Sequence, residues 1–85
     1  MFTVYILYSP KYKKTYAGQT SDLGKRMDFH NEKSISTFTS KFRPWILLYS
    51  ENFPTRIEVM KREKWFKSGV GREFIKRIKE EYLKS

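Results

Sequence analysis

Five side chains carry the chemistry that this sequence can offer: two tyrosines, an arginine, a histidine and a glutamate. Arg26 and His30 are four residues apart, so a helix would place both on one face. The planar guanidinium of an arginine matches the oxygens of a phosphate. Tyr5 or Tyr16 can accept a proton only where nearby positive charge stabilises the phenolate, because a free phenol has a pKa of about 10. These residue types indicate chemistry at a phosphate, with Glu63 as the candidate ligand of a metal ion.

Glu63 occupies an unusual place on its predicted helix. At about 100° per residue it falls inside an apolar arc formed by Ile57, Val59, Met60 and Phe66. A carboxylate within a buried stripe is costly unless it is paired or bound to a metal ion. The competing explanation is a partly exposed glutamate at the edge of the stripe that pairs with a lysine. Lys67 also falls in this arc, where its stem can lie along apolar surface while the ammonium reaches water, so the arc does not by itself mark a buried carboxylate. The helical wheel alone favours the ion pair.

The other candidates also have ordinary structural explanations. Strand tyrosines are often half-buried without a chemical role, and a lone histidine is more often a hydrogen-bonded structural residue than a ligand. Arg26 has apolar neighbours on the helical wheel, which predicts that its stem is packed. Gly18 is expected to serve the backbone by letting a strand end close to a helix start. Trp45 is assigned to the core, whereas Trp65 is the better candidate for stacking on a base.

The composition bounds the class of protein. The chain has 85 residues with 39% hydrophobic and 18% aromatic content, which predicts one folded domain over residues 1–85. The net charge of +9 indicates a polyanionic partner, and lysines spread along the chain favour nucleic acid over a membrane surface. The absence of cysteine excludes disulfides and thiolate metal sites. No apolar run approaches the roughly 20 residues of a membrane span. The start lacks the basic segment of a signal peptide, so we expect a cytoplasmic protein.

Two strands, a helix and a third strand must position the first candidates. β-Branched and aromatic residues predict strands over residues 2–8 and 15–19, joined by a basic turn. Thr20, Ser21 and Asp22 offer N-cap oxygens to the helix that carries Arg26 and His30. The polar segment 31–43 predicts a loop. The apolar run 45–49 predicts a strand that is buried on both faces.

The second half of the chain predicts two helices. Thr55 and Glu58 form a capping-box pattern at the start of the first helix, which should run to about Lys67. Gly69 is expected to end this helix in a left-handed C-cap, and a last helix should begin at about Gly71. Its apolar face should consist of Phe74, Ile75, Ile78 and Tyr82. Cations of these two helices are the predicted nucleic-acid contacts: Lys61, Arg62, Lys64, Lys67, Arg72 and Lys76.

The ordered set of motifs resembles the GIY-YIG nuclease family. The two signature triplets correspond to Thr3-Val4-Tyr5 and Tyr16-Ala17-Gly18, and the helix pattern corresponds to Arg26 and His30. The segment around Glu63 resembles the part of the family that bears a metal-binding glutamate, and a Gly-x-Gly-Arg at 69–72 follows it. The resemblance covers most of the chain. It points to small stand-alone bacterial members and to the N-terminal endonuclease domain found in the excinuclease ABC system of DNA repair.

The resemblance implies an α+β fold in the order ββαβαα, with a three-stranded antiparallel sheet flanked by helices and, we expect, the first strand at its centre. It also implies a metal-dependent endonuclease that acts on DNA, including branched or damaged DNA. Glu63 would hold one Mg²⁺ or Mn²⁺, and Tyr5 or, preferably, Tyr16 would activate the attacking water. Arg26 would stabilise charge on the phosphate, and His30 would orient the phosphate or the water. A partner protein is an additional source of specificity.

The chain also departs from the family pattern. Val4 stands without the usual glycine-isoleucine pair, Ala17 replaces the common isoleucine, and Gln19 stands where some relatives have a lysine. These departures bear on catalytic efficiency more than on the fold.

Two alternatives to an enzyme stay open. One is a nucleic-acid-binding module of the same fold that does not cut, and the other is a protein-interaction domain whose basic face meets an acidic partner.

Overall fold

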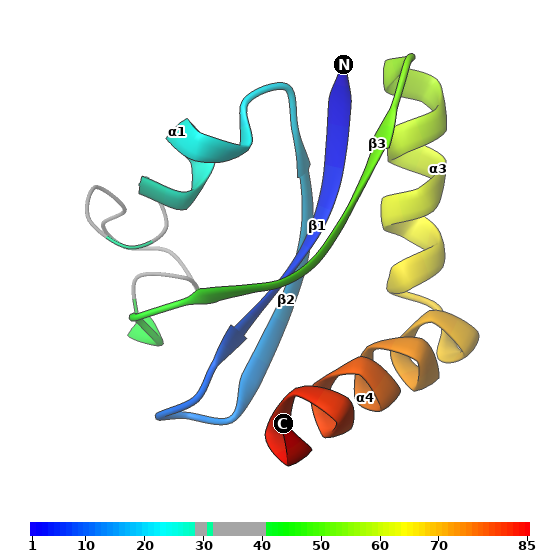
Figure 1. Cartoon of the computed structure of the whole chain (residues 1–85). Coiled ribbons are helices and arrows are strands. Elements are labelled where there is room, and N and C mark those ends of the chain that lie inside the picture. The colour runs from blue at the N-terminus through cyan, green and yellow to red at the C-terminus, as the bar shows by residue number, and fades with distance from the viewer. Residues whose placement is uncertain (29–30, 32–40) are drawn as a thin grey trace.

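The computed structural model describes residues 1–28, 31 and 41–85, which form an α+β fold in the predicted ββαβαα order. The strands and helices are β1 (Phe2–Ser9), β2 (Lys14–Thr20), α1 (Leu23–Asp28), β3 (Ile46–Phe53), α3 (Arg56–Phe66) and α4 (Gly69–Lys84). Helix α1 lies on one face of the sheet, whereas α3 and α4 lie on the other (Figure 1). His30 and most of the predicted loop lie outside the described residues. None of the described helices is long and apolar enough to cross a membrane.

Strand β1 is the centre of an antiparallel sheet with the order β2-β1-β3, as expected. It is buried along nearly its whole length, which explains its continuous apolar and aromatic sequence. The turn to β2 closes when the backbone N–H of Lys13 donates to the carbonyl of Ser9 at 2.7 Å. A bulge between Ile6 and Leu7 interrupts the pairing with β3. This register decides which side chains share each face of the sheet.

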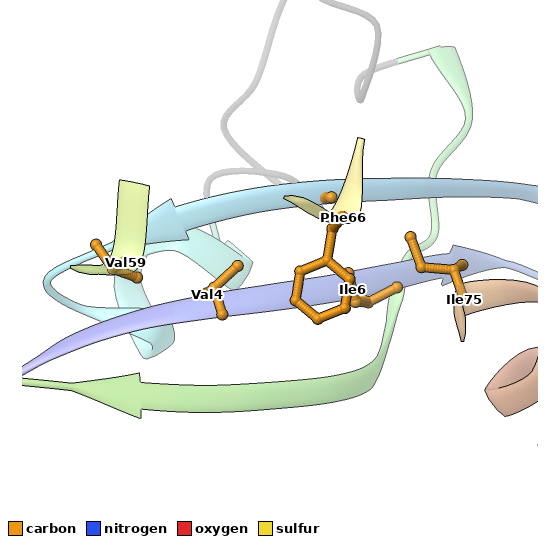
Figure 2. Close-up of a cluster of buried hydrophobic side chains, with 6 residues drawn as sticks. Val4, Ile6, Val59, Phe66 and Ile75 are labelled. Carbon is orange, nitrogen blue, oxygen red and sulfur yellow. The ribbon is translucent and has the colours of Figure 1, made fainter. Parts of the chain in front are cut away.

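Alternation along β1 divides the buried core into two clusters, one on each face. The cluster under α3 and α4 consists of Val4, Ile6, Ala17, Val59, Phe66 and Ile75 (Figure 2). The cluster on the side of α1 consists of Tyr5, Leu7 and Trp45, with Tyr16, Leu23, Met27 and Phe42 packed against it. Both candidate tyrosines therefore lie on the α1 face, opposite the larger helices.

The third strand differs from the prediction. It begins at Ile46 and lies at the edge of the sheet. All of its residues are half-buried or exposed, with Leu47 43% exposed, so the strand is not buried on both faces. Trp45 precedes the strand and belongs to the core, as expected. Its backbone N–H donates to Asn31 Oδ1 at 2.6 Å, and its carbonyl accepts from Asn31 Nδ2 at 3.0 Å. Strand β3 is apolar at its start because it leaves this core cluster and not because it is central.

The start of α3 follows the predicted capping box. Thr55 Oγ1 accepts a hydrogen bond from the backbone N–H of Glu58 at 3.3 Å and donates one to Glu58 Oε2 at 2.9 Å. The first N–H groups of a helix lack partners within it, so this cap satisfies one of them.

The apolar arc predicted for α3 is wrong in part. Val59 and Phe66 are buried, but Ile57 is 68% exposed and Met60 is 50% exposed. The helix meets the sheet along the stripe that runs from Val59 to Phe66 at helical spacing, and Glu63 lies on this stripe. Glu63 therefore lies beside the core, although two of the four residues used to place it there do not.

The predicted roles of Gly69 and Gly71 are not the observed ones, because both residues lie in the first turn of α4. Helix α4 begins at Gly69, after an N-cap at Ser68 whose Oγ accepts from the backbone N–H of Gly71, so no left-handed C-cap forms. A β-carbon at Gly71 would overlap the carbonyl oxygen of Trp65 and the Cα of Phe66. Gly71 is therefore the position where α4 approaches the end of α3 without room for a side chain.

Substitution of the two glycines should separate these effects. Gly71→Ala forces a methyl group into backbone atoms of α3 and should lower the free energy of unfolding by about 1–3 kcal/mol. In Gly69→Ala the new β-carbon meets no heavy atom within 4 Å, so stability should be unchanged or rise by about 0.4–1 kcal/mol. Urea unfolding followed by circular dichroism measures both, and equal effects of the two variants would refute the close approach at Gly71.

Candidate active site

Tyr5 and Tyr16 come together across β1 and β2, on the same face of the sheet. Their ring centroids are 6.5 Å apart with an interplanar angle of 36°. Gly18 pairs with Tyr5, and a β-carbon at Gly18 would lie 2.5 Å from the Tyr5 hydroxyl oxygen and 3.0 Å from Tyr16 Cε1. The sequence assigned Gly18 to a strand end near a helix. The structure gives another reason, because only glycine leaves room for the phenol of Tyr5.

The Tyr5 phenol is almost fully buried, and its environment holds it in the protonated form. Burial raises its pKa far above the ordinary value, and the neighbouring Tyr16 and the Glu63 carboxylate raise this pKa further, whereas the Arg26 guanidinium lowers it. These influences also show that Tyr16, Arg26 and Glu63 lie within electrostatic reach of one hydroxyl. Tyr5 is therefore suited to donate a hydrogen bond, and Tyr16 is the more accessible of the two phenols.

Helix α1 supplies Arg26 to this site. As predicted, residues before the helix cap it: Asp22 Oδ1 accepts from the backbone N–H of Lys25 at 3.0 Å, and Thr20 Oγ1 accepts from the backbone N–H of Asp22 at 3.1 Å. Arg26 is an exposed residue, and the packing of its stem stays a prediction. The guanidinium lies beside a surface hollow of about 380 Å³ lined by Thr20, Ser21, Asp22, Lys25 and Arg26. The site thus has a cation that solvent and a phosphate can reach.

Glu63 approaches the same site from α3. Its side chain is 23% exposed, and its Oε2 pairs with Lys67 Nζ at 3.0 Å, one helical turn along. The ion pair expected as the alternative to a metal is therefore present. The Glu63 carboxylate therefore already binds one cation, the ammonium of Lys67.

The donor set fits one hydrated divalent ion and not a protein cage. Within residues 1–28, 31 and 41–85, no group of three or more acidic or histidine side chains gathers as a metal site. Mg²⁺ commonly keeps several waters and binds through one or two carboxylates together with substrate phosphates. Glu63, half-buried and next to Lys67, fits that mode of binding. The role of His30 stays a prediction, since this residue lies outside the described part of the chain.

Arg62, one of the predicted nucleic-acid contacts, is held within the protein. Its Nε donates to Glu51 Oε1 at 2.8 Å and its Nη2 donates to Glu51 Oε2 at 3.1 Å. The guanidinium lies 4.1 Å from the ring centroid of Trp65. The hydrogen bond with Arg62 holds the pKa of Glu51 below its usual range. Arg62 thus clamps α3 to β3, and Trp65 lies beneath it.

The other five predicted contacts are distributed over separate surfaces. Lys61 and Lys64 line a hollow on α3 with Ile57 and Met60. Lys76 lies on α4 in a shallow site with Glu73, Arg77 and Glu80. Lys67 and Arg72 line a pocket that also includes Tyr16. Of the six predicted cations, these two are the ones that the structure places beside a candidate catalytic residue.

Sequence reasoning missed the role of Asn31, whose amide holds both backbone groups of Trp45. The contact joins two residues that are 14 positions apart in the sequence. A pattern among neighbouring residues therefore cannot predict it. Gln19, noted only as a departure from the family, is next to Gly18 and has a buried side-chain oxygen with no hydrogen-bond partner in the described structure. A polar residue in a β2 position that faces the core was the signal that could have drawn attention to it.

Comparison with known proteins shows which family the chain resembles. A family model described as the GIY-YIG catalytic domain matches residues 1–79. A UPF0213 protein of Bacillus velezensis is 38% identical over 68 residues, which cover 80% of this chain and 64% of that protein. The UPF0213 protein YazA of Bacillus subtilis is 42% identical over 52 residues, which cover 61% of this chain and 52% of that protein.

A UPF0213 protein of Enterococcus faecalis is 35% identical over 72 residues, which cover 82% of this chain and 76% of that protein. The solution NMR structure of a UPF0213 protein from Bacillus halodurans matches with a TM-score of 0.53 and 29% identity. This match covers 93% of this chain and 86% of the other. The chain therefore spans most of the Enterococcus relative but less than two thirds of the length of the first two relatives.

The contact between Gly18 and Tyr5 can be tested directly. Gly18→Ala should lower the free energy of unfolding by about 1–3 kcal/mol, because the new methyl group meets a buried phenol. Adding Tyr5→Phe should recover part of this loss, since the hydroxyl is removed but Cζ stays 2.7 Å from the place of the added β-carbon. Gly24→Ala is the control, because its β-carbon would lie 3.6 Å from Asp22 Oδ1 and should be tolerated. Additive effects of Gly18→Ala and Tyr5→Phe would contradict the contact.

Proposed function

Because the chain belongs to the GIY-YIG family, we propose that it is an endonuclease that hydrolyses DNA phosphodiester bonds with one divalent metal ion. The observation that carries this proposal is the convergence of three groups on the Tyr5 hydroxyl. Tyr16, Arg26 and Glu63 come from three different elements, and all lie within electrostatic reach of the Tyr5 phenol. The net charge of +9 supports a polyanionic substrate.

The two phenols take different roles in this proposal. Tyr5 stays protonated because burial raises its pKa, so it donates a hydrogen bond to the phosphate or to the attacking water. Tyr16 is half-buried, and we assign it as the base that accepts the proton from the water. Positive charge would have to stabilise the phenolate in this step, and we assign it to Arg26, which lies within electrostatic reach of the neighbouring Tyr5.

Arg26 and Glu63 are assigned to the negative charge of the phosphate. The Arg26 guanidinium stabilises negative charge as it develops on the phosphate oxygens in the transition state. Glu63 would hold Mg²⁺ or Mn²⁺ in place of its ion pair with Lys67. The chemistry that such an ion would supply when bound is Lewis-acid stabilisation of charge on the phosphate and on the leaving oxygen.

A module that binds nucleic acid without cutting it is the second candidate. The observation that favours it is the ion pair between Glu63 and Lys67, which satisfies the carboxylate without a metal ion. The two candidates share a basic surface and differ in what Glu63 does.

Substitution of Glu63 distinguishes the two candidates. Glu63→Gln should keep the fold, because size and helix propensity change little. Metal-dependent nicking of a plasmid should fall at least about 100-fold, since the variant loses a charge interaction of several kcal/mol. DNA affinity in EDTA should stay the same or rise, because one repulsive charge is removed.

The matched control is Glu81→Gln, which removes the same charge from an exposed position on α4. It should leave nicking unchanged. Nicking by Glu63→Gln at the wild-type rate would exclude Glu63 as the metal ligand. A wild-type protein that cuts no linear, nicked, flap or branched DNA in Mg²⁺ or Mn²⁺ would favour the binding module.

Salt dependence tests the nucleic-acid partner itself. Affinity for duplex DNA should fall linearly with the logarithm of salt concentration, with a slope of about −0.9 for each phosphate contact. Fluorescence anisotropy at several salt concentrations measures this slope. Binding that does not respond to salt, or no binding at low salt, would favour an acidic protein as the partner.

A further inference from the structure

The turn between β1 and β2 carries a basic surface that has no place in the function proposed above. It lies at the end of the sheet away from the start of α1 (Figure 1). Lys11, Tyr12, Lys13 and Lys14 are all exposed there. Phe42 lies against the turn, because its ring centroid is 5.4 Å from that of Tyr12. We call these five residues the hairpin surface.

The cations of the hairpin surface are not compensated by nearby acids in the sequence. Residues 1–20 contain no aspartate or glutamate, and neither do residues 41–50. In the part of the chain that the structure describes, ion pairs join Arg62 to Glu51 and Lys67 to Glu63, and none involves the three lysines of the turn. A cluster of one sign of charge attracts an anionic partner.

Aromatic rings hold two of these cations in place. Lys11 Nζ lies 5.4 Å from the centroid of the Tyr12 ring, and Lys14 Nζ lies 5.6 Å from the centroid of the Phe42 ring. Both distances are within the range of a cation–π interaction. The two rings meet edge to face at 70°. The ammonium groups are therefore partly ordered before a partner binds, which lowers the entropy cost of binding.

The hairpin surface is attached to the same face of the sheet as the candidate tyrosines. Phe42 packs against the core cluster of Tyr5, Leu7 and Trp45. Tyr5 pairs with Gly18, and Ser9 pairs with Lys14, four residues further along both strands. At about 3.3 Å per residue, the turn begins roughly 13 Å from the candidate active site. A long ligand can thus contact both places at once.

Lys13 has a backbone conformation that is unusual for a lysine. Its φ is 57°, in the left-handed region that glycine adopts more readily. The turn closes through the backbone N–H of Lys13, so the turn itself does not need the lysine side chain. Sparsely populated backbone conformations often occur at functional sites. A lysine at a position that suits glycine indicates a use for its charge.

We propose that the hairpin surface binds the phosphate backbone of the DNA on one side of the bond that is cut. The inference rests on the proposed function, since it takes the tyrosine site as the place of hydrolysis. One strand of duplex DNA advances about 3.4 Å for each nucleotide, so the first phosphates at the turn lie roughly four nucleotides from the cut bond. The main backbone contact is therefore this surface and not the outer face of α3, where Lys61 and Lys64 lie.

Two double variants with equal charge test this assignment. Lys11→Gln with Lys14→Gln changes the hairpin surface, and Lys61→Gln with Lys64→Gln changes exposed positions on α3. We would measure fluorescence anisotropy with a 5′-labelled duplex of about 20 base pairs in EDTA at several salt concentrations. The salt slope of the hairpin variant should be less steep than that of the wild type by about 1.8, which corresponds to two lost phosphate contacts. The α3 variant should keep nearly the wild-type slope.

A third variant separates charge from stability. Lys13→Gly removes one charge and gives the turn a residue that adopts the left-handed conformation without strain. The melting temperature should stay the same or rise, whereas the salt slope should become less steep by about 0.9. A slope that stays at the wild-type value would exclude Lys13 as a phosphate contact.

The outcomes distinguish this surface from the endonuclease assignment. Equal slopes for the two double variants, or a loss confined to the α3 variant, would overturn the proposal. Wild-type slopes for all variants would favour an acidic protein as the partner of the hairpin surface. If the hairpin variant loses slope as expected but the wild type cuts no DNA, the surface assignment stands and the endonuclease assignment fails.

Discussion

The close approach of Tyr5 to Gly18 is the constraint on which the candidate site depends. The phenol oxygen lies where a β-carbon of residue 18 would be, so β2 must carry glycine opposite a buried tyrosine. This contact places the Tyr5 hydroxyl against β2, beside Gly18 and the Tyr16 ring. Helix α1, which carries Arg26, and α3, which carries Glu63, lie on opposite faces of the sheet (Figure 1), and both residues lie within electrostatic reach of Tyr5.

A second close approach holds the other half of the site. Gly71 lets α4 pack against the backbone at the end of α3, and the bidentate pair of Arg62 with Glu51 ties α3 to β3. These two contacts fix α3 relative to the sheet. Lys67 and Arg72 then lie beside β2, where they line a pocket with Tyr16. The basic character of the chain is thus used in different ways: Arg62 stabilises packing, whereas Lys67 and Arg72 border the site.

Much of the fold could be predicted because its signals are local. The β-branched and aromatic strands, the Asp22 and Thr55 caps and the ordered family motifs all depend on neighbouring residues, and the strand order, helix order and family are confirmed. The predictions that were wrong depend on tertiary contacts. An apolar run such as 46–49 has the same sequence pattern whether its strand lies at the centre or at the edge of a sheet. Helical periodicity could not tell that Ile57 and Met60 face solvent. Nor could it show that Arg62 has Glu51 as a partner or that Gly71 lies against α3.

The central claim is that Glu63 and the two tyrosines form one site for a single divalent ion. Paramagnetic broadening of backbone amide signals by Mn²⁺, added well below one equivalent to ¹⁵N-labelled protein, tests it most directly. The account predicts that signals of Glu63, Gly18 and Gln19 broaden first, because they belong to the two sides of the same site. Glu80 and Glu81, on the far part of α4, should stay sharp. Broadening centred on Glu80 and Glu81, or equal broadening throughout the protein, would contradict the account.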